Sequence, residues 1–155
     1  MMIWTSRYSN KELQKDDCYC VGISLGRPRF KIKYILRKQC YDLAPDRSMW
    51  GKELDEFRKL YFAKLDKMGT EKVRNILSAL YMEAQENNKK LVLLCFEDVR
   101  IPGDWCHRTI LAEWVQQNLG WNMQELFNPD LPKRKKSIQK QENPQQLSLF
   151  DYINA

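Results

Sequence analysis

Hydrophobic positions follow two different spacings along this chain, and together they predict an α/β protein. Five consecutive apolar or small residues, Leu91 to Cys95, fit a strand that is buried on both faces. Residues at helical spacing follow after a polar loop: Ile110, Leu111, Trp114, Val115 and Leu119. Gly120 then ends this helix. A buried strand that leads into a helix is the βα unit of an open sheet, whose ligand crevice lies outside the carboxyl ends of the strands.

Similar patterns predict the other elements. Short strands are expected near Met2–Ser6 and over Cys18–Leu25. One long helix is expected from Trp50 to Met68 with Gly69 as its C-cap, and Thr70 can cap the next helix. The sequence of the segment 29–49 fits either a strand or a basic amphipathic turn. We therefore expect a three-layer α/β fold with an open, mostly parallel sheet flanked by helices.

A change in composition divides the chain into two parts. Residues 1–128 carry the hydrophobic patterns and are expected to form the α/β domain. The stretch from Pro129 to Pro144 has few apolar residues and includes the basic run Lys133–Lys136, so we expect a flexible linker. Apolar residues return near the C-terminus, so 129–155 is interpreted as a disordered basic linker with a terminal docking peptide.

The composition indicates a single-domain, basic protein with reduced cysteines. The 155 residues suffice for one domain with an appendage, and a net charge of +6 with a pI of about 9.1 favours acidic partners such as nucleic acid. Five cysteines without a signal-peptide pattern indicate reduced thiols in a cytoplasmic protein. No apolar run approaches the roughly 20 residues of a membrane span, so no membrane association is expected.

Several candidate functional residues lie at the predicted start of the helix in the βα unit. The first turn of a helix presents unpaired N–H groups, so Cys106, His107 and Arg108 are placed where an anion would bind. Arg108 would add a bidentate donor for phosphate, and Cys106 would gain thiolate character as a candidate nucleophile. Helical neighbours point about 100° apart, however, so Cys106 and His107 need not touch and both equally fit core positions. Asp104, as N-cap, would compete with a bound anion.

Further candidate site residues lie at the ends of the predicted strands. Glu97 follows the buried strand and could act as a general base. Ser24, Gly26 and Arg27 end the second strand, and Arg7 ends the first. If these strands are parallel, the three arginines Arg7, Arg27 and Arg108 could converge on a phosphate group.

Metal and cofactor sites receive less support from the sequence. Possible ligands exist in Cys18, Cys20, Cys95, Cys106 and His107, but only Cys18 and Cys20 lie close together in sequence, which is unlike a zinc knuckle. We therefore predict no metal site. Neither glycine-rich nucleotide fingerprint is present, so we predict no cofactor. A thiol redox protein that uses Cys95 and Cys106 is a weaker alternative, because no Cys-x-x-Cys motif occurs.

Several of these segments resemble one protein family. They are Ile23–Pro28, Tyr41–Pro45, Leu93–Glu97, Cys106–Arg108 and Leu111–Trp114. Over roughly residues 2–120 the chain resembles the family called domain of unknown function 488. The resemblance implies a three-layer α/β fold and a pocket around the matching residues Ser24, Arg27, Cys95, Glu97, Cys106, His107 and Arg108. It implies no activity, and Leu25 stands where many relatives are expected to have a basic residue.

The C-terminal pentapeptide Gln146-Leu147-Ser148-Leu149-Phe150 carries a second resemblance. It is similar to the short peptide by which bacterial replication and repair proteins bind the sliding clamp. Leu149 and Phe150 would fill an apolar pocket, and Gln146 would set the register. The alternative is that these apolar side chains pack on the chain's own domain.

Two functional hypotheses follow. The first is a domain that binds or acts on a nucleotide or nucleic acid in DNA metabolism and is tethered to the clamp. As an enzyme it would be a hydrolase or transferase on a phosphorylated or nucleic-acid substrate, with Cys106 and Glu97 as catalytic residues. The second is a non-enzymatic nucleic-acid adaptor that uses Lys133–Lys136 to bind the phosphate backbone.

Overall fold

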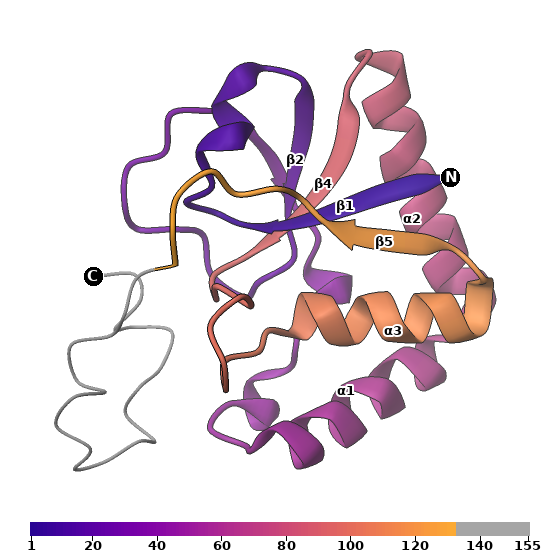
Figure 1. The fold of residues 1–155 in the computed structure, drawn as a ribbon. Helices are drawn as coiled ribbons and strands as arrows, with labels where there is room; N and C mark the ends of the chain where they lie inside the picture. The colour runs from indigo at the N-terminus through magenta and orange to yellow at the C-terminus, as the bar shows by residue number, and fades with distance from the viewer. Residues whose placement is uncertain (133–155) are drawn as a thin grey trace, which may run out of the picture.

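Five parallel strands form one sheet in the computed structural model, which describes residues 1–132 (Figure 1). The strands are β1 (Met2–Arg7), β2 (Cys18–Gly22), β3 (Leu36–Gln39), β4 (Lys90–Cys95) and β5 (Asn122–Glu125). Their order is β3-β2-β4-β1-β5, so β4 lies at the centre between β2 and β1. The predicted open α/β sheet is confirmed.

The central strand β4 is buried on both faces, as its continuous apolar run predicts. Leu91 and Leu93 belong to the core that the helices cover, whereas Val92 and Leu94 belong to the core on the opposite face. All four side chains are fully buried. Such a strand cannot show the alternation of a half-exposed strand, because both of its faces are covered by protein.

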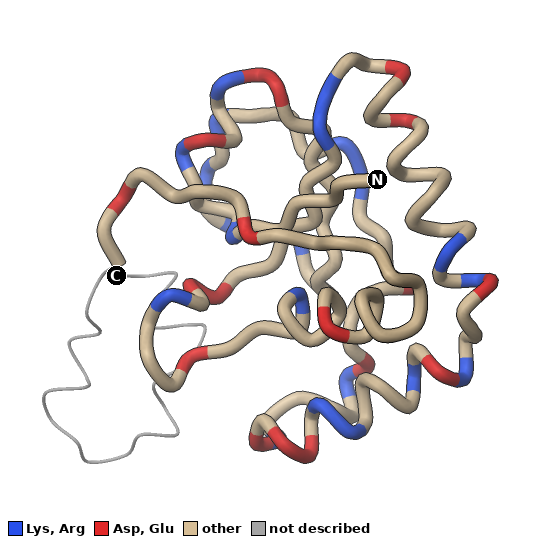
Figure 2. Tube along the Cα trace, turned by 45° about the vertical axis from the view of Figure 1, so that its right-hand side comes forward, with Lys and Arg blue, Asp and Glu red and all other residues tan. Residues whose placement is uncertain are grey.

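Three α-helices pack on one face of the sheet (Figure 1). They are α1 (Leu54–Met68), α2 (Thr70–Glu86) and α3 (His107–Leu119). Helices α2 and α3 contact the sheet, while α1 packs against both of these helices. The buried positions at helical spacing are Phe57, Tyr61 and Leu65 in α1, and Val73, Leu77, Leu80 and Ala84 in α2. Leu54, which has the same spacing, is 40% exposed. Basic and acidic residues are interleaved along the outer sides of α1 and α2 (Figure 2).

A thinner layer covers the other face of the sheet. The 3-10 helix η1 (Lys11–Lys15) buries Leu13 there, and Phe30 and Tyr34 from the connection between β2 and β3 pack against the same core. The hydroxyl of Tyr34 donates to the backbone carbonyl of Tyr8 over 2.7 Å. The sheet therefore lies between a helical layer and a layer built mainly from irregular chain.

Two predicted boundaries differ from the observed ones. Strand β2 ends at Gly22 instead of Leu25. The segment 29–49, which the sequence leaves open, contains the third strand, β3, from Leu36. Helix α1 begins at Leu54 and not at Trp50, whose side chain is 57% exposed and whose backbone is extended. Trp50 therefore does not belong to the buried stripe. Two short 3-10 helices, η2 (Tyr41–Leu43) and η3 (Arg47–Met49), precede α1.

Gly69 and Gly120 both act where the sequence places them. Gly120 caps α3 in the left-handed conformation, with φ 69° and ψ 15°. Gly69, with φ 90°, ends α1 and also precedes α2, so Thr70 is the first residue of α2 and not its cap. None of the helices within residues 1–132 has the length and apolar character needed to cross a membrane. The basic run Lys133–Lys136 and the pentapeptide Gln146–Phe150 lie outside the described residues.

Candidate functional site

The carboxyl ends of three parallel strands meet the N-terminus of α3. Arg7, the last residue of β1, is paired in register with Cys95, the last residue of β4, and Gly22 at the end of β2 is paired with Leu94. Helix α3 begins at His107. The strand ends lie together as the sequence predicts, because the strands are parallel.

Cys95, Cys106 and His107 form a buried group that we call the sulfur–imidazole cluster. The imidazole Nδ1 of His107 lies 3.3 Å from the Sγ of Cys95 and 3.7 Å from the Sγ of Cys106. The Nε2 of the same ring lies 2.5 Å from the backbone oxygen of Ile23, and the edge of the ring meets Tyr61 with 5.5 Å between ring centroids. Two elements, β4 and the start of α3, thus contribute the three side chains.

The contact with Ile23 decides which nitrogen of His107 carries a proton. A backbone carbonyl oxygen only accepts hydrogen bonds, so Nε2 must be the donor. In the neutral imidazole, Nδ1 then has a free lone pair, and this lone pair faces the two sulfur atoms. Nδ1 can therefore accept a proton from a thiol or bind a metal ion.

The backbone conformation of Cys106 explains why its sulfur reaches the imidazole of the next residue. Cys106 is the N-cap of α3, with extended φ and ψ angles of −143° and 153°. The sequence leaves open whether Cys106 and His107 touch, because neighbours within a helix point apart. They do lie in contact, since Cys106 precedes the helix and is not part of it. The predicted N-cap, Asp104, lies two residues before the observed N-cap, Cys106.

The pKa values of the two thiols move in opposite directions. Burial raises the pKa of Cys95 well above its ordinary value, and the neighbouring Cys106 raises it further. Burial would also raise the pKa of Cys106, but a hydrogen bond from Cys95 and the interactions with His107 and Arg108 outweigh this effect and lower it well below its ordinary value. Cys106 is therefore the more acidic thiol of the pair.

Arg108 lies within the domain and not in a solvent-filled pocket. Its side chain is 0% exposed, and its guanidinium forms a bidentate pair with Glu125 of β5, with N···O distances of 3.0 and 2.8 Å. Nη2 also donates to the backbone oxygen of Glu97 over 2.7 Å. Arg108, which the sequence predicts to bind phosphate, thus joins α3 to the sheet. Its buried Nη1 group has no hydrogen-bond partner among residues 1–132.

A second ion-pair group lies at the same edge. Asp98, 2% exposed, accepts hydrogen bonds from Arg7 at 3.1 Å and from Arg100 at 3.0 and 2.9 Å. Burial lowers the pKa of Arg7, and the nearby charge of Arg108 adds to this, although Asp98 opposes both effects. The Nε of Arg7 is a second buried nitrogen without a partner in the described part of the chain.

The residues predicted from the end of the second strand are divided between two places. Ser24 is buried and forms a 2.6 Å hydrogen bond with the hydroxyl of Tyr8, and its own hydroxyl donates to the carbonyl of Gly26. Gly22 leaves the space for Tyr8 and Gln39, because a Cβ there would overlap both side chains. Arg27 is exposed and takes part in no side-chain hydrogen bond or ion pair within residues 1–132. The predicted convergence of three arginines therefore involves Arg100 in place of Arg27.

The two predicted catalytic residues, Cys106 and Glu97, both lie at this edge, and their roles stay predictions. Cys106 is 3% exposed, which favours a function toward a small ligand or an ion over attack on a polymer. Glu97 is partly exposed, and its backbone carbonyl binds Arg108. Sequence reasoning missed Asp98, Arg100 and Glu125, although the sequence Glu97-Asp98-Val99-Arg100 directly after a buried strand already places charges of both signs at the edge.

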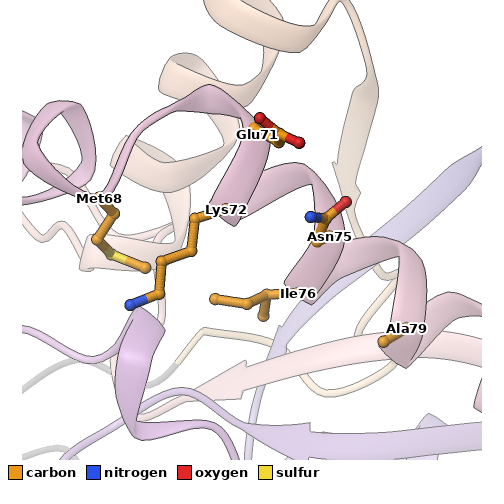
Figure 3. A pocket seen from close by; sticks show the side chains of 6 residues that line it. All are labelled: Met68, Glu71, Lys72, Asn75, Ile76 and Ala79. Atoms are coloured by element: carbon orange, nitrogen blue, oxygen red, sulfur yellow. The ribbon is translucent and has the colours of Figure 1, made fainter.

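A shallow hollow elsewhere on the surface does not belong to this site. It has a volume of about 590 Å³ and lies over the start of α2, where Figure 3 shows the side chains that line it. They are Met68, Glu71, Lys72, Asn75, Ile76 and Ala79. None of these residues belongs to the carboxyl edge, so the hollow carries no argument about the chemistry there.

The resemblance of the sequence to the family called domain of unknown function 488 stays an expectation. Four of the matching residues, Cys95, Cys106, His107 and Arg108, lie together at the start of α3. Comparison with family models, curated proteins and solved structures finds no match to this chain.

Proposed function

We propose that this protein binds a phosphorylated or nucleic-acid ligand at the carboxyl edge of its sheet and that its C-terminal peptide tethers it to the bacterial sliding clamp. The first part rests on one observation: two arginines of this edge, Arg7 and Arg108, each keep a buried nitrogen without a hydrogen-bond partner in the described residues. Buried N–H groups are normally satisfied, so unsatisfied donors indicate an absent acceptor.

Phosphate is the acceptor that fits these donors. Guanidinium N–H groups bind phosphate oxygens through charge-assisted hydrogen bonds, and the first turn of α3 adds backbone N–H groups and the positive end of the helix dipole. Arg100 contributes a third positive charge, whereas Asp98 and Glu125 contribute two negative charges. The pairing with these carboxylates fixes the arginines in place and leaves their remaining donors oriented, which lowers the entropic cost of binding.

Replacing Arg7 with lysine tests the phosphate proposal. Lysine keeps a cation beside Asp98 but has no counterpart of the unsatisfied Nε–H. A hydrogen bond to a charged group contributes about 1.5–3 kcal/mol, so the affinity for phosphate should fall roughly 10- to 100-fold. Calorimetric titration with inorganic phosphate, a nucleoside triphosphate and a single-stranded oligonucleotide measures the loss and ranks the three ligands.

Arg74→Lys is the matched control, because Arg74 is exposed on α2, away from the carboxyl edge. It should bind like the unaltered protein. Equal affinities for the Arg7→Lys variant and the unaltered protein, or no binding by the unaltered protein to any of the three ligands, would contradict the proposal. Circular dichroism shows whether both variants keep the fold.

The clamp tether rests on the pentapeptide Gln146–Phe150, whose sequence resembles the clamp-binding motif. Replacing both Leu149 and Phe150 with alanine should remove the apolar anchors and weaken binding to a purified bacterial sliding clamp by a factor of roughly 100 or more, since anchor residues commonly contribute 2 kcal/mol or more each. Surface plasmon resonance with immobilised clamp measures this change.

Gln139→Ala, in the preceding basic segment, is the control for the tether. It changes one polar residue outside the motif and should leave the affinity unchanged. If the double variant binds the clamp as tightly as the unaltered chain, the tether is refuted while the phosphate proposal still stands.

A further inference from the structure

Three donor atoms of the sulfur–imidazole cluster already lie at separations suited to a metal ion. The Sγ atoms of Cys95 and Cys106 and the Nδ1 of His107 all lie within 4.8 Å of one another, and the two S···N distances are 3.3 and 3.7 Å. Tetrahedral zinc, with Zn–S near 2.3 Å and Zn–N near 2.0–2.1 Å, places its ligands about 3.5–3.8 Å apart. We propose that Cys95, Cys106 and His107 bind a thiophilic divalent metal ion, with Zn²⁺ as the ion that fits best.

The orientation of His107 supports this assignment. A metal-binding histidine usually donates its other ring N–H to a carbonyl or carboxylate, which fixes the ring and leaves the ligating nitrogen deprotonated. The Nε2 of His107 lies against the backbone oxygen of Ile23, and its Nδ1 faces both sulfur atoms. The ring is therefore held in the tautomer and direction that coordination through Nδ1 requires.

The charge balance of the sulfur–imidazole cluster also favours a divalent metal ion. All three side chains are buried, and burying an uncompensated thiolate is costly. Two thiolates and one divalent cation form a neutral group, and the adjacent Arg108–Glu125 pair is neutral as well. Two sulfurs and one imidazole nitrogen also match the ligand preference of zinc over magnesium or calcium.

Three protein ligands leave the fourth tetrahedral position for a water molecule or an anion. This arrangement is typical of zinc sites that act on a ligand, whereas purely structural zinc sites use four protein side chains. Arg108 follows His107 directly, and its positive charge, which acts on Cys106, would favour an anion in that position. With the metal bound, Cys106 is a ligand and not a nucleophile.

The metal site stands apart from the phosphate and clamp proposals, because its ligands include neither Arg7 nor the C-terminal peptide. Reduced, metal-free full-length protein should bind one equivalent of Co²⁺ and develop the thiolate-to-cobalt charge-transfer band and the visible bands of tetrahedral cobalt. Zn²⁺ should then displace the cobalt. X-ray absorption at the zinc edge should show two sulfurs near 2.3 Å and imidazole nitrogen near 2.0–2.1 Å.

Single substitutions assign the ligands. Cys95→Ser, Cys106→Ser and His107→Gln should each weaken zinc binding by a factor of 100 or more, on the order expected for loss of a direct ligand. Cys18→Ser is the matched control, because Cys18 is buried on the opposite face of the sheet. His107 is the only histidine in the sequence, so an imidazole signal from the unaltered protein identifies it without any variant.

Several outcomes would overturn the proposal. They are binding of less than one equivalent, a zinc shell with fewer than two sulfurs or without imidazole, and equal zinc affinities for the Cys106→Ser variant and the unaltered protein. Loss of binding in the Cys18→Ser variant would place the sulfurs elsewhere. If a ligand variant fails to fold, the zinc-edge spectrum of the unaltered protein still decides the result.

Discussion

Replacing Arg108 with methionine is expected to lower the free energy of unfolding by about 3–5 kcal/mol, a large part of the stability of a domain of this size. The guanidinium is fully buried and joins α3 to β5 through Glu125, and it also satisfies the backbone carbonyl of Glu97. Methionine fills much of the same volume but leaves both acceptors without their partner. Urea denaturation followed by circular dichroism measures the change.

The chain contains a matched control for this substitution. Arg58 of α1 makes a bidentate pair with Glu113 of α3, but both side chains are 42% exposed. Water screens such a pair, so Arg58→Met should leave the free energy of unfolding almost unchanged. Equal losses for Arg58→Met and Arg108→Met would show that burial of Arg108 contributes nothing beyond the ion pair itself.

Replacing Asp98 with asparagine should lower stability by about 3 kcal/mol at neutral pH, because it removes the carboxylate that separates Arg7 from Arg100. Part of each guanidinium remains accessible to water, which keeps the cost below that of an entirely buried pair. Denaturation of the variant and of the unaltered protein should be compared across a series of pH values.

The pH dependence has a definite sign. Burial alone would raise the pKa of Asp98, but the hydrogen bonds and charge of Arg100, together with the charge of Arg7, lower it below the usual 3.8. A carboxyl whose pKa is lowered by folding stabilises the protein above its unfolded-state pKa, and this contribution is lost as the pH falls through the folded-state pKa. The Asp98→Asn variant lacks this contribution, so the two stability curves should converge in acid. Parallel curves from neutral pH down to strong acid would contradict the prediction.

The fold was predictable wherever one pattern was unambiguous. The run Leu91–Cys95 identifies a central strand because both of its faces are buried, and the three-and-four spacing in α1 and α2 identifies their inward sides. Strand β3 could not be predicted, because only half-buried or exposed residues form it and its register shifts against β2. An edge strand of this kind depends on its neighbour for its conformation more than on its own side chains.

The candidate site was predictable in place but not in detail. Parallel strands and a helix start locate Cys95 and Cys106 at one edge, yet the sequence separates them by ten residues and gives no metal-binding spacing. Their proximity depends on the extended backbone of Cys106 and on the path of the loop before it. Glu125, the ion-pair partner of Arg108, follows α3 in the sequence. Only the pairing of β5 with β1 brings Glu125 close to Arg108.

The central position of β4 has a consequence for how the protein folds during its synthesis. Strands β1 and β2 do not pair with each other, because β4 lies between them. The N-terminal 89 residues therefore leave the ribosome with both strands lacking their main hydrogen-bonding partner, and the sheet closes only when residues 90–95 arrive. Pairing across such long stretches of chain slows folding and exposes unpaired strand edges in the meantime. A nascent chain that stalls before residue 90 is thus expected to depend on chaperones to stay out of aggregates.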